Sequence, residues 1–589
     1  MAGLGEPIND GGPSRFQSEC ASCHRAHVLV AWDILSEVDG RPIAFSMVGF
    51  MASTAAEAPN VPAVRDSRFW LCFMATLVVD LLSALDLTAV STALPTIVQR
   101  LHGTEFIWVG SAYAIASTAV LPTVGGLVTI FGRKPILICF IATFALGSAI
   151  CGAARSMDIL IVGRAVQGIG GGGCIAVTEI IYADLVSLPE RGKFQGIAAM
   201  VWAFASGMGP PIGGTLAKSE AWRWLFFLNL PLCGLAIAVV AIYLRVNTPR
   251  QGFKKGLLQM DWIGVLLIIS GALLIMVGLT WGGIKFPWKS IHVLVPISIG
   301  AIFLVGFVFF EVYWADATGH ATVPTILMNN TTILSGFLGT FFHGIVSMAV
   351  IFYLPIYLQA CQLASPIRSG IDYFGLALTI APFAIFTGVS VEIFKCYRPQ
   401  NYIGWALNIA GFALLSTLKV SSPMREYIGY QVVLGIGLGI TWISTQFPIL
   451  APLPYSNNAY ALAFFTFLRC FAQTWGTVIG GAILQTYLST RLPNSLHDVA
   501  ATNPELIYAL IPTIHRLPEP VRSDLQRVFS EGLAIVWRVM IGLSGAGFLT
   551  CLLMREIPMR TALDEAWGLK DKEIDGVTPE TLPEKNGGR

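Results

Sequence analysis

The chain has 589 residues, of which 54% are hydrophobic and only 12% are charged, and its formal net charge is +2 at pH 7. Soluble domains usually carry about a quarter of charged residues, so the composition excludes an ordinary soluble protein and suits a lipid bilayer. The nearly balanced charge also gives no indication of a nucleic-acid partner.

The segment before the first apolar stretch, residues 1–66, has no charged start followed by an apolar run and a cleavage site, so we expect no cleavable signal peptide. We expect this segment to be a disordered cytoplasmic tail. Met51 opens a short polar stretch that leads into the first apolar run, which makes it a candidate alternative start beside Met1.

Apolar stretches of about twenty residues, the length with which a helix crosses about 30 Å of hydrocarbon, recur from residue 69 onward. They lack the alternating pattern of barrel strands, so they predict α-helices. We therefore expect an all-α polytopic membrane protein with fourteen spans, at residues 69–94, 106–130, 136–154, 159–183, 194–216, 224–244, 262–281, 291–312, 333–358, 374–394, 403–418, 427–450, 462–484 and 533–553.

The basic residues of the loops indicate the orientation of the chain. Seven lysines and arginines follow spans two, four and six, against four on the other side, although later loops weaken this excess. Because cytoplasmic loops are enriched in basic residues, we expect both termini in the cytoplasm. The seven are Arg133, Lys134, Arg191, Lys193, Arg250, Lys254 and Lys255.

An internal repeat divides the chain. The Gly168-Ile169-Gly170 run of span four recurs at Gly435, and the Gly209 motif of span five recurs at Gly476, in both cases 267 residues later. One offset shared by two helices and their loop predicts two homologous helical bundles. The expected domains are the tail 1–66, a six-helix bundle 67–247, two linker helices 248–326, a second six-helix bundle 327–556 and a cytoplasmic tail 557–589.

Several motifs occur in one order along the chain: LDLTAVSTALPTI in span one, FGRKPIL after span two, GRAVQGIGGGG in span four, GMGPPIGG in span five and WRWLFFLNLP at the start of span six. In this order they resemble the fourteen-span drug:proton antiporter branch of the major facilitator superfamily. The resemblance implies two six-helix bundles with two extra central helices. It also implies a secondary active transporter, not an enzyme, that exports small amphipathic organic compounds such as drugs, toxins or secondary metabolites against protons.

Two ionisable residues are the candidates for proton coupling. A guanidinium in the middle of a glycine-rich apolar helix is costly, so Arg164 should face the bundle interior and meet a partner. Its counterpart in the repeat is the neutral Gln431. The resemblance assigns proton coupling to Arg164, and Asp86 in the LDxT position is the expected carboxylate. A structural alternative is that Arg164 caps helix carbonyls.

Other acidic residues compete with Asp86. Asp80 lies six residues earlier, about 120° away around the helix, so the two carboxylates cannot face one partner equally. Glu179, Glu311, Glu392 and Asp372 lie nearer to span ends, where we expect solvated or snorkelling side chains.

Two glycine motifs carry the expected gate and antiport functions of the family. After span two, Thr129 occupies the position of the family's aspartate, which puts the strength of the gate in doubt. In span five the glycines allow close helix approach and the prolines remove backbone hydrogen bonds, which also fits packing alone. The motif residues are Gly125, Gly132, Arg133, Lys134, Gly209, Pro210, Gly213 and Gly214.

The second bundle supplies the candidates for a substrate cavity. Polar and aromatic residues there suit amphipathic organic molecules with a few hydrogen-bonding groups. Arg469 and Gln473 are four residues apart on one helical face and match the family's RxFxQxxG run. The other candidates are His343, Tyr353 and Gln359, of which the aromatic residues also fit a packing function.

We expect no cofactor and no metal. The G-x-G-x-x-G spelling at Gly168 lies inside an apolar span without a preceding strand, the C-x-x-C-H at Cys20 lacks a haem-binding domain, and no phosphate loop occurs. The expected partners are the bilayer, protons and a small organic substrate, at the plasma membrane or the vacuolar membrane. Two alternatives are proton-coupled uptake of siderophores or nutrients, and a nutrient sensor that does not transport.

Overall fold

The structure is a computed structural model that describes residues 67–101, 107–218, 221–244, 258, 260–283, 285–315, 321–491 and 511–560. These residues belong to one compact unit that begins at Val64. The N-terminal tail, with Met51 and the C-x-x-C-H run, lies outside the described residues, as does the C-terminal tail beyond residue 560. The part of the chain that is described is helical, with one isolated bridge between Gly282 and Phe286 in place of strands.

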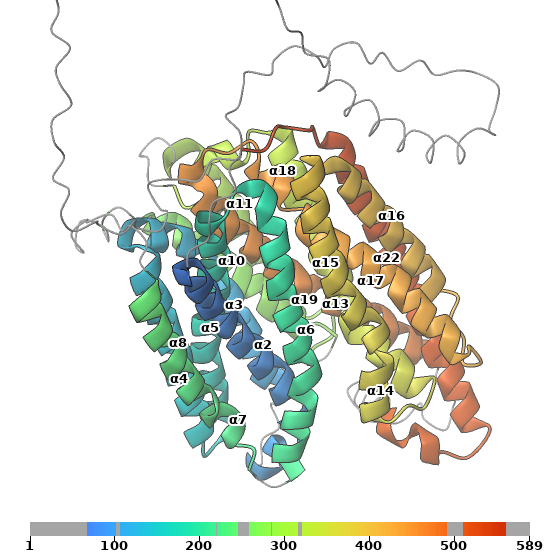
Figure 1. Ribbon diagram of the computed structural model, residues 1–589. Coiled ribbons are helices and arrows are strands. Elements are labelled where there is room, and N and C mark those ends of the chain that lie inside the picture. Colours follow the sequence, from blue (N-terminus) through green and yellow to red (C-terminus); the bar gives the residue numbers. More distant parts are fainter. Residues whose placement is uncertain are drawn as a thin grey trace, which may run out of the picture. The chain divides into compact units, whose positions relative to one another are not determined.

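Helices cover all fourteen expected spans (Figure 1). The first eight are α2 (Ser67–Leu101), α3 (Ile107–Phe131), α4 (Arg133–Ala153), α5 (Met157–Leu185), α6 (Leu188–Lys218), α7 with α8 (Trp224–Phe227, Asn229–Tyr243), α10 (Trp262–Trp281) and α11 (Ile291–Phe310), which continues as a π-helical turn at Glu311–Ala315. The remaining six are α13 (Thr331–Ala360), α14 with α15 (Pro366–Asp372, Phe374–Phe394), α16 (Arg398–Leu415), α17 with α18 (Met424–Ser444, Phe447–Leu450), α19 (Asn458–Arg491) and α22 (Val521–Thr550).

Among the described residues, twelve helices are long and apolar enough to cross a bilayer. The other two expected spans lie in α6 and α16. The first turns of α6 carry Glu190, Arg191 and Lys193, and α16 begins at Arg398 and holds buried Asn408, so both helices are less apolar than their neighbours. The all-α polytopic fold is confirmed, whereas the number of fourteen crossings stays a prediction.

Helix packing follows the same pattern in both halves of the described chain. In the first half, α5 packs between α3 and α4, and α2 packs against α6 and α8. In the second half, α17 packs between α15 and α16, and α13 packs against α19 and α22. The halves contact each other through α6 with α15 and α3 with α19, and the extra helix α10 packs against α3, α19 and α11. The residue limits of the individual domains stay a prediction.

The repeated glycines are points of close helix approach. A Cβ atom on Gly170 would lie 2.3 Å from the Phe144 nitrogen in α4, and one on its counterpart Gly437 would lie 2.7 Å from the Asn408 nitrogen in α16. Because no side chain fits at either distance, the two halves use the same glycine for the same helix contact. The repeat in the sequence therefore corresponds to a repeat in packing.

Candidate functional site

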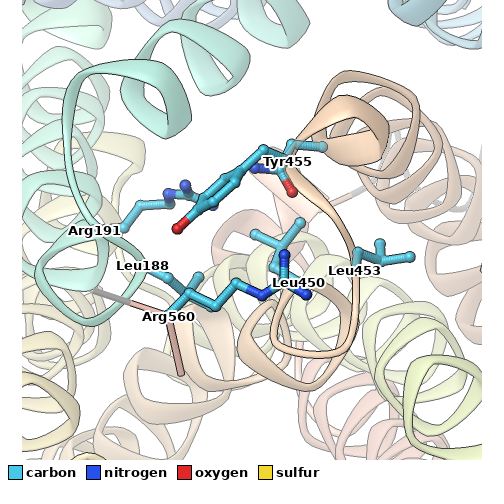
Figure 2. Close-up of a pocket in the computed structure, with 7 residues that line it drawn as sticks. Leu188, Arg191, Leu450, Leu453, Tyr455 and Arg560 are labelled. Atoms are coloured by element: carbon cyan, nitrogen blue, oxygen red, sulfur yellow. The ribbon is translucent and has the colours of Figure 1, made fainter. Parts of the chain in front are cut away.

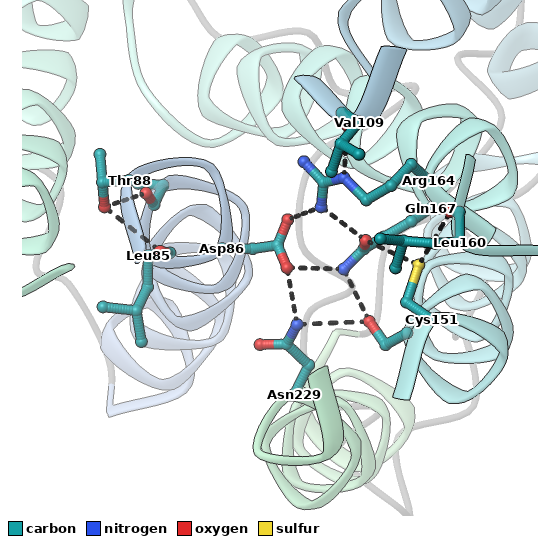
Figure 3. A network of polar contacts seen from close by, with 11 residues as sticks. Leu85, Asp86, Thr88, Val109, Cys151, Leu160, Arg164, Gln167 and Asn229 are labelled. Carbon is teal, nitrogen blue, oxygen red and sulfur yellow. Dashed lines mark hydrogen bonds and ion pairs between the residues drawn. The ribbon is translucent and has the colours of Figure 1, made fainter. Parts of the chain in front are cut away.

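Asp86 and Arg164 form a buried ion pair inside the first half (Figure 3). The Arg164 Nη1 donates to Asp86 Oδ2 at 2.5 Å, and the two residues are only 1% and 3% exposed. The pair joins α2 to α5, and its two residues are 78 positions apart in the sequence. Arg164 therefore meets a partner in the bundle interior, as the sequence predicts. Its function in proton coupling stays a prediction.

The other oxygen of Asp86 is held by two amides. Asp86 Oδ1 accepts hydrogen bonds from Gln167 Nε2 at 2.7 Å and from Asn229 Nδ2 at 3.0 Å. Both amides also donate to the hydroxyl of Ser148, at 2.8 and 3.3 Å. The network thus gathers side chains of α2, α4, α5 and α8 around one carboxylate, and every one of them is buried.

Arg164 has further contacts that do not involve the carboxylate. Its Nε donates to the carbonyl of Val109 at 3.0 Å, and its Nη1 also donates to Gln167 Oε1 at 2.7 Å. The guanidinium lies over the ring of Tyr113, 4.5 Å from the ring centroid, in the geometry of a cation–π contact. The structural alternative, in which Arg164 caps a helix carbonyl, is therefore also realised, alongside the ion pair.

The supporting residues Gln167, Asn229 and Ser148 were not predicted from the sequence. Gln167 had a usable signal, because residues three apart lie on one face of a helix and Gln167 follows Arg164 at that spacing. Asn229 and Ser148 had none, since a lone amide or hydroxyl in an apolar span does not show which helix it faces.

Asp80 has neutral partners. Its carboxylate accepts from the Tyr182 hydroxyl at 2.7 Å and from the Thr178 hydroxyl at 3.0 Å, and it is 4% exposed. Asp80 and Asp86 therefore contact α5 at different heights, and Arg164 pairs with Asp86. The expected separation of the two carboxylates is confirmed.

The expectation for the acidic residues near span ends is wrong for two of them. Glu311 and Asp372 are 4% and 3% exposed. Glu311 Oε1 accepts from the backbone nitrogens of Thr322 and Val323, and Asp372 accepts from the Tyr427 hydroxyl. Local hydrogen bonds that the sequence does not reveal make burial of these carboxylates possible.

The loop after α3 uses a different carboxylate from the one that the family's motif supplies. Arg133 Nε donates to Asp184 at the end of α5 at 2.8 Å, and its Nη1 donates to the Val128 carbonyl. Thr129, in the aspartate's position, donates to the carbonyl of Gly125 in its own helix. Asp184 was missed in the sequence, where its only signal was an acidic residue at the end of a span.

The other motif residues have distinct surroundings. Gly132 has φ 89°, a left-handed conformation that favours glycine, and Lys134 Nζ donates to the Ala241 carbonyl at 2.5 Å. A Cβ on Gly209 would lie 2.1 Å from Thr88 Oγ1, whereas one on Gly214 would meet open space. Helix α6 continues through Pro210 and Gly213. Their antiport function stays a prediction.

The two halves meet closely where α6 begins and α15 ends. A Cβ on Gly388 would lie 2.2 Å from the carbonyl carbon of Gly192, so the two backbones touch. The adjacent Lys193 Nζ donates to Glu392 at 3.0 Å, and both side chains are half-buried. We call this contact the α6–α15 seal.

The candidates for the substrate cavity are only partly brought together. His343 and Arg469 both contact Trp442: the His343 ring centroid is 5.7 Å from that of Trp442, and the Arg469 guanidinium carbon is 4.4 Å from it. Arg469 also donates to the Trp442 carbonyl at 2.9 Å. His343 Nδ1 and Arg469 Nε are buried without a hydrogen-bond partner.

The remaining candidates lie apart from this cluster. Tyr353 is buried against α19, where a Cβ on Gly480 would lie 2.1 Å from its ring, and its hydroxyl donates to the Thr477 carbonyl. Gln359 donates to the Ser369 hydroxyl at 3.4 Å. Gln473, half-buried, lies one turn after Arg469. Substrate binding by any of these residues stays a prediction.

Comparison with known proteins identifies the family. Residues 76–477 match the model of the Major Facilitator Superfamily. The chain belongs to the major facilitator superfamily. It is 34% identical over 530 residues to the "Efflux pump FUS6" of Gibberella fujikuroi, covering 88% of this chain and 95% of that protein. It is also 34% identical over 525 residues to the "Acurin A biosynthesis cluster MFS-type transporter" of Aspergillus aculeatus, covering 87% and 94%.

Solved structures show the same fold in more distant transporters of the superfamily. The human organic anion transporter MFSD10 aligns with a TM-score of 0.51 at 14% identity, covering 83% of this chain and all of that one. The proton:xylose symporter XylE also aligns with a TM-score of 0.51, at 12% identity, covering 78% and 98%. Membership of the superfamily, shown by the family model and the relatives, makes the chain a multi-pass membrane transporter, in contact with lipid and with a small-molecule substrate, and not an enzyme.

Proposed function

We propose that this transporter exports small amphipathic organic compounds, such as toxins or secondary metabolites, in exchange for protons. The observation that supports the proposal most is the Asp86–Arg164 pair, a buried carboxylate that is held by an arginine on one oxygen and by two amides on the other. Export, as opposed to uptake, is supported by the names of the relatives, which are efflux pumps of fungi.

The two oxygens of Asp86 differ in what a proton would do. Oδ1 accepts two N–H hydrogen bonds and continues to accept them when the acid is neutral. A proton on Oδ2 removes the acceptor that faces Arg164 Nη1 and the negative charge that the guanidinium balances. Protonation at Oδ2 therefore loosens the link between α2 and α5 and leaves the amide contacts in place.

Arg164 keeps a stable environment when Asp86 is neutral. The Val109 carbonyl, Gln167 Oε1 and the Tyr113 ring all stay available to the guanidinium. A buried arginine without such contacts would be expensive, so these contacts allow Asp86 to change its charge while Arg164 stays charged. The pair thus has the two states that proton coupling requires.

The transport cycle follows from two packed halves that rock about a central site. The α6–α15 seal holds the halves together at the end of the molecule that carries the loops after α3 and α5. In the proposed orientation, with both termini in the cytoplasm, that end is cytoplasmic, and the seal corresponds to a state closed to the cytoplasm. Proton binding at Asp86 from the outside then favours reopening inward. We place the protein in the plasma membrane.

Cells that express the protein test the direction of transport. A labelled secondary metabolite of a fungus is loaded into cells of a strain that lacks its own pumps. It should leave energised cells faster when they express the wild type than when they express Asp86→Asn. Uptake is the rival function, and it requires label added outside to accumulate in a manner that depends on the energised membrane. Accumulation of this kind would overturn export while leaving the proton site untouched.

A further inference from the structure

A small hollow lies where the two halves meet, beside the start of α6 (Figure 2). Its wall brings together the first turn of α6, the segment between α18 and α19, and the C-terminal segment. The lining residues are Leu188, Arg191, Leu450, Leu453, Tyr455, Asn458 and Arg560. Figure 2 shows Arg191 entering from α6 and Arg560 from the C-terminal segment, with the Tyr455 ring between them.

Arg191 is the unusual residue of the hollow. It is 2% exposed, and its Nη2 donates to the Ala183 carbonyl at 2.8 Å. Its Nε and Nη1, however, are buried without any hydrogen-bond partner. Asp184 is the acidic residue with the strongest electrostatic interaction with Arg191. Its Oδ2, however, already accepts a hydrogen bond from Arg133 Nε at 2.8 Å. Two unsatisfied N–H groups on a buried cation are costly unless an acceptor binds to them.

Three further features around the hollow favour negative charge. Arg560 lies with its guanidinium carbon 5.7 Å from the Tyr455 ring centroid and adds a second positive charge. Leu188 is the first residue of the 31-residue helix α6, and Asn458 is the first residue of the 34-residue helix α19. Helix N-termini carry a partial positive charge, and they bind phosphate and other oxyanions in many proteins.

We propose that this hollow binds a phosphate group, held by Arg191 and Arg560 between the N-termini of α6 and α19. Phosphate oxygens accept charge-assisted hydrogen bonds from guanidinium N–H groups, and Nε and Nη1 are the two nitrogens that Arg191 leaves unused. The phosphate belongs either to a free anion or to the headgroup of an anionic lipid. Its binding does not depend on the proposed export.

The site has a consequence for the transport cycle, and this step alone depends on the proposed alternating access. The hollow is formed by α6 from the first half and by Tyr455, Asn458 and Arg560 from the second half. A phosphate bound there bridges the halves at the end where the α6–α15 seal lies. The bound anion therefore stabilises the state with this end closed and slows its opening.

The test measures thermal unfolding of the purified full-length protein against inorganic phosphate in detergent, at constant ionic strength set with chloride. The same measurement in nanodiscs compares phosphatidylcholine alone with phosphatidylcholine that contains phosphatidic acid. Arg560→Gln changes an exposed residue and should weaken the apparent affinity about tenfold, as the loss of one charge-assisted hydrogen bond does. Arg191→Gln should abolish the effect, and Arg555→Gln, an exposed arginine of the same segment outside the hollow, should leave it unchanged.

The outcomes separate the two sources of phosphate. Saturable stabilisation by phosphate in detergent, with an apparent affinity about tenfold weaker in Arg560→Gln, supports a free anion. Stabilisation that needs phosphatidic acid and is weaker in the same variant supports a lipid headgroup. If neither phosphate nor phosphatidic acid stabilises the wild type more than Arg560→Gln, the site does not exist, even where Arg191→Gln fails to fold. Transport does not enter this measurement, so failure of the export proposal would leave its result standing.

Discussion

At the scale of single residues, Asp86 is unusual because its two oxygens have different partners. Oδ2 faces the Arg164 guanidinium, whereas Oδ1 receives the amides of Gln167 and Asn229. A carboxylate held only by charges would lose all its contacts on protonation. Asp86 would lose one and keep two, so the site changes charge without losing its geometry.

The substitution Asp86→Asn should separate coupling from folding. The asparagine keeps an acceptor for the amides but removes the counter-charge of Arg164. Removing one partner of a buried ion pair costs about 3–5 kcal/mol, which the Val109 carbonyl, Gln167 Oε1 and the Tyr113 ring offset only in part. We expect a lowered melting temperature and loss of transport driven by a pH difference, measured with the purified protein in vesicles. If transport by Asp86→Asn depended on the pH difference as strongly as transport by the wild type does, Asp86 would not be the coupling residue.

The matched control is Asp80→Asn on the same helix. Asp80 accepts from the hydroxyls of Tyr182 and Thr178 on different oxygens. The oxygen of an asparagine can accept from Tyr182, and its amide can donate to the Thr178 hydroxyl, which also donates to the Ile175 carbonyl. We therefore expect the ratio of transport with and without a pH difference to stay within about twofold of the wild type, which is a free-energy change below about 0.5 kcal/mol. If the pH difference no longer increased transport in Asp80→Asn but still did so in Asp86→Asn, the coupling site would be Asp80 and not Asp86.

At the scale of helices, the α6–α15 seal depends on glycine. A Cβ on Gly388 would lie 2.2 Å from the backbone of Gly192, so Gly388→Ala must push the helices apart. Overpacking of this kind costs about 1–3 kcal/mol. Because the cost arises only while the halves touch, we expect the population to shift toward the state in which this end is open.

The shift is measurable with a cysteine at the buried Thr387, one residue from the contact. A water-soluble maleimide should modify Thr387→Cys several times faster in Gly388→Ala than in the parent, with the labelled peptide followed by mass spectrometry. The control is Gly429→Ala, since a Cβ on Gly429 meets nothing within 4 Å. Equal rates in all three proteins would show that the seal does not control this end.

The segment after α22 fastens α16 through Glu556. Its carboxylate accepts from the backbone nitrogens of Tyr397 and Arg398, at the start of α16. Burial nevertheless raises the pKa of Glu556 above its ordinary value of 4.5, with the hydrogen bonds from Tyr397 and Arg398 acting in the opposite direction. The folded protein therefore favours the protonated acid more than the unfolded chain does.

The sign of the pH dependence follows. A group whose pKa is raised on folding contributes its full stability below the ordinary pKa and loses it as the pH rises through the folded pKa. The melting temperature of the wild type, relative to that of Glu556→Gln, should therefore fall as the pH rises from about 4. The loss of one acceptor in the glutamine variant is independent of pH, so only the trend is diagnostic. A difference in melting temperature that rises with pH would show that the hydrogen bonds from Tyr397 and Arg398 outweigh burial in setting the pKa of Glu556.

Much of the helical architecture could be predicted from the sequence, and the site only in part. Continuous apolar runs reveal membrane helices because lipid imposes length and composition, and the 267-residue repeat reveals which contacts recur. Arg164 was predictable because a charge in lipid needs a partner. Asn229, Ser148 and Asp184 were not, because their importance depends on which helices pack side by side, and helix neighbours do not follow from the apolar pattern of one sequence.

At the scale of the whole molecule, the repeat makes the two halves alike in packing and unlike in charge. The glycine contacts of α5 recur in α17, but the position of Arg164 is occupied by Gln431, which is fully buried and accepts from the Leu376 backbone. The first half therefore carries the buried ion pair, and the second half carries the His343–Trp442–Arg469 cluster. We expect proton binding and substrate binding to be divided between the halves in the same way.

The central claim is that one proton at Asp86 is tied to the movement of one organic molecule. The most direct measurement reconstitutes the purified wild type in sealed vesicles, imposes a pH difference without a membrane potential, and follows a labelled substrate and the internal pH together. We predict that substrate moves against the direction of proton flow, that the internal pH shifts only when substrate is present, and that both signals vanish in Asp86→Asn. Substrate movement at a rate and to a gradient that ignore the pH difference would contradict the account.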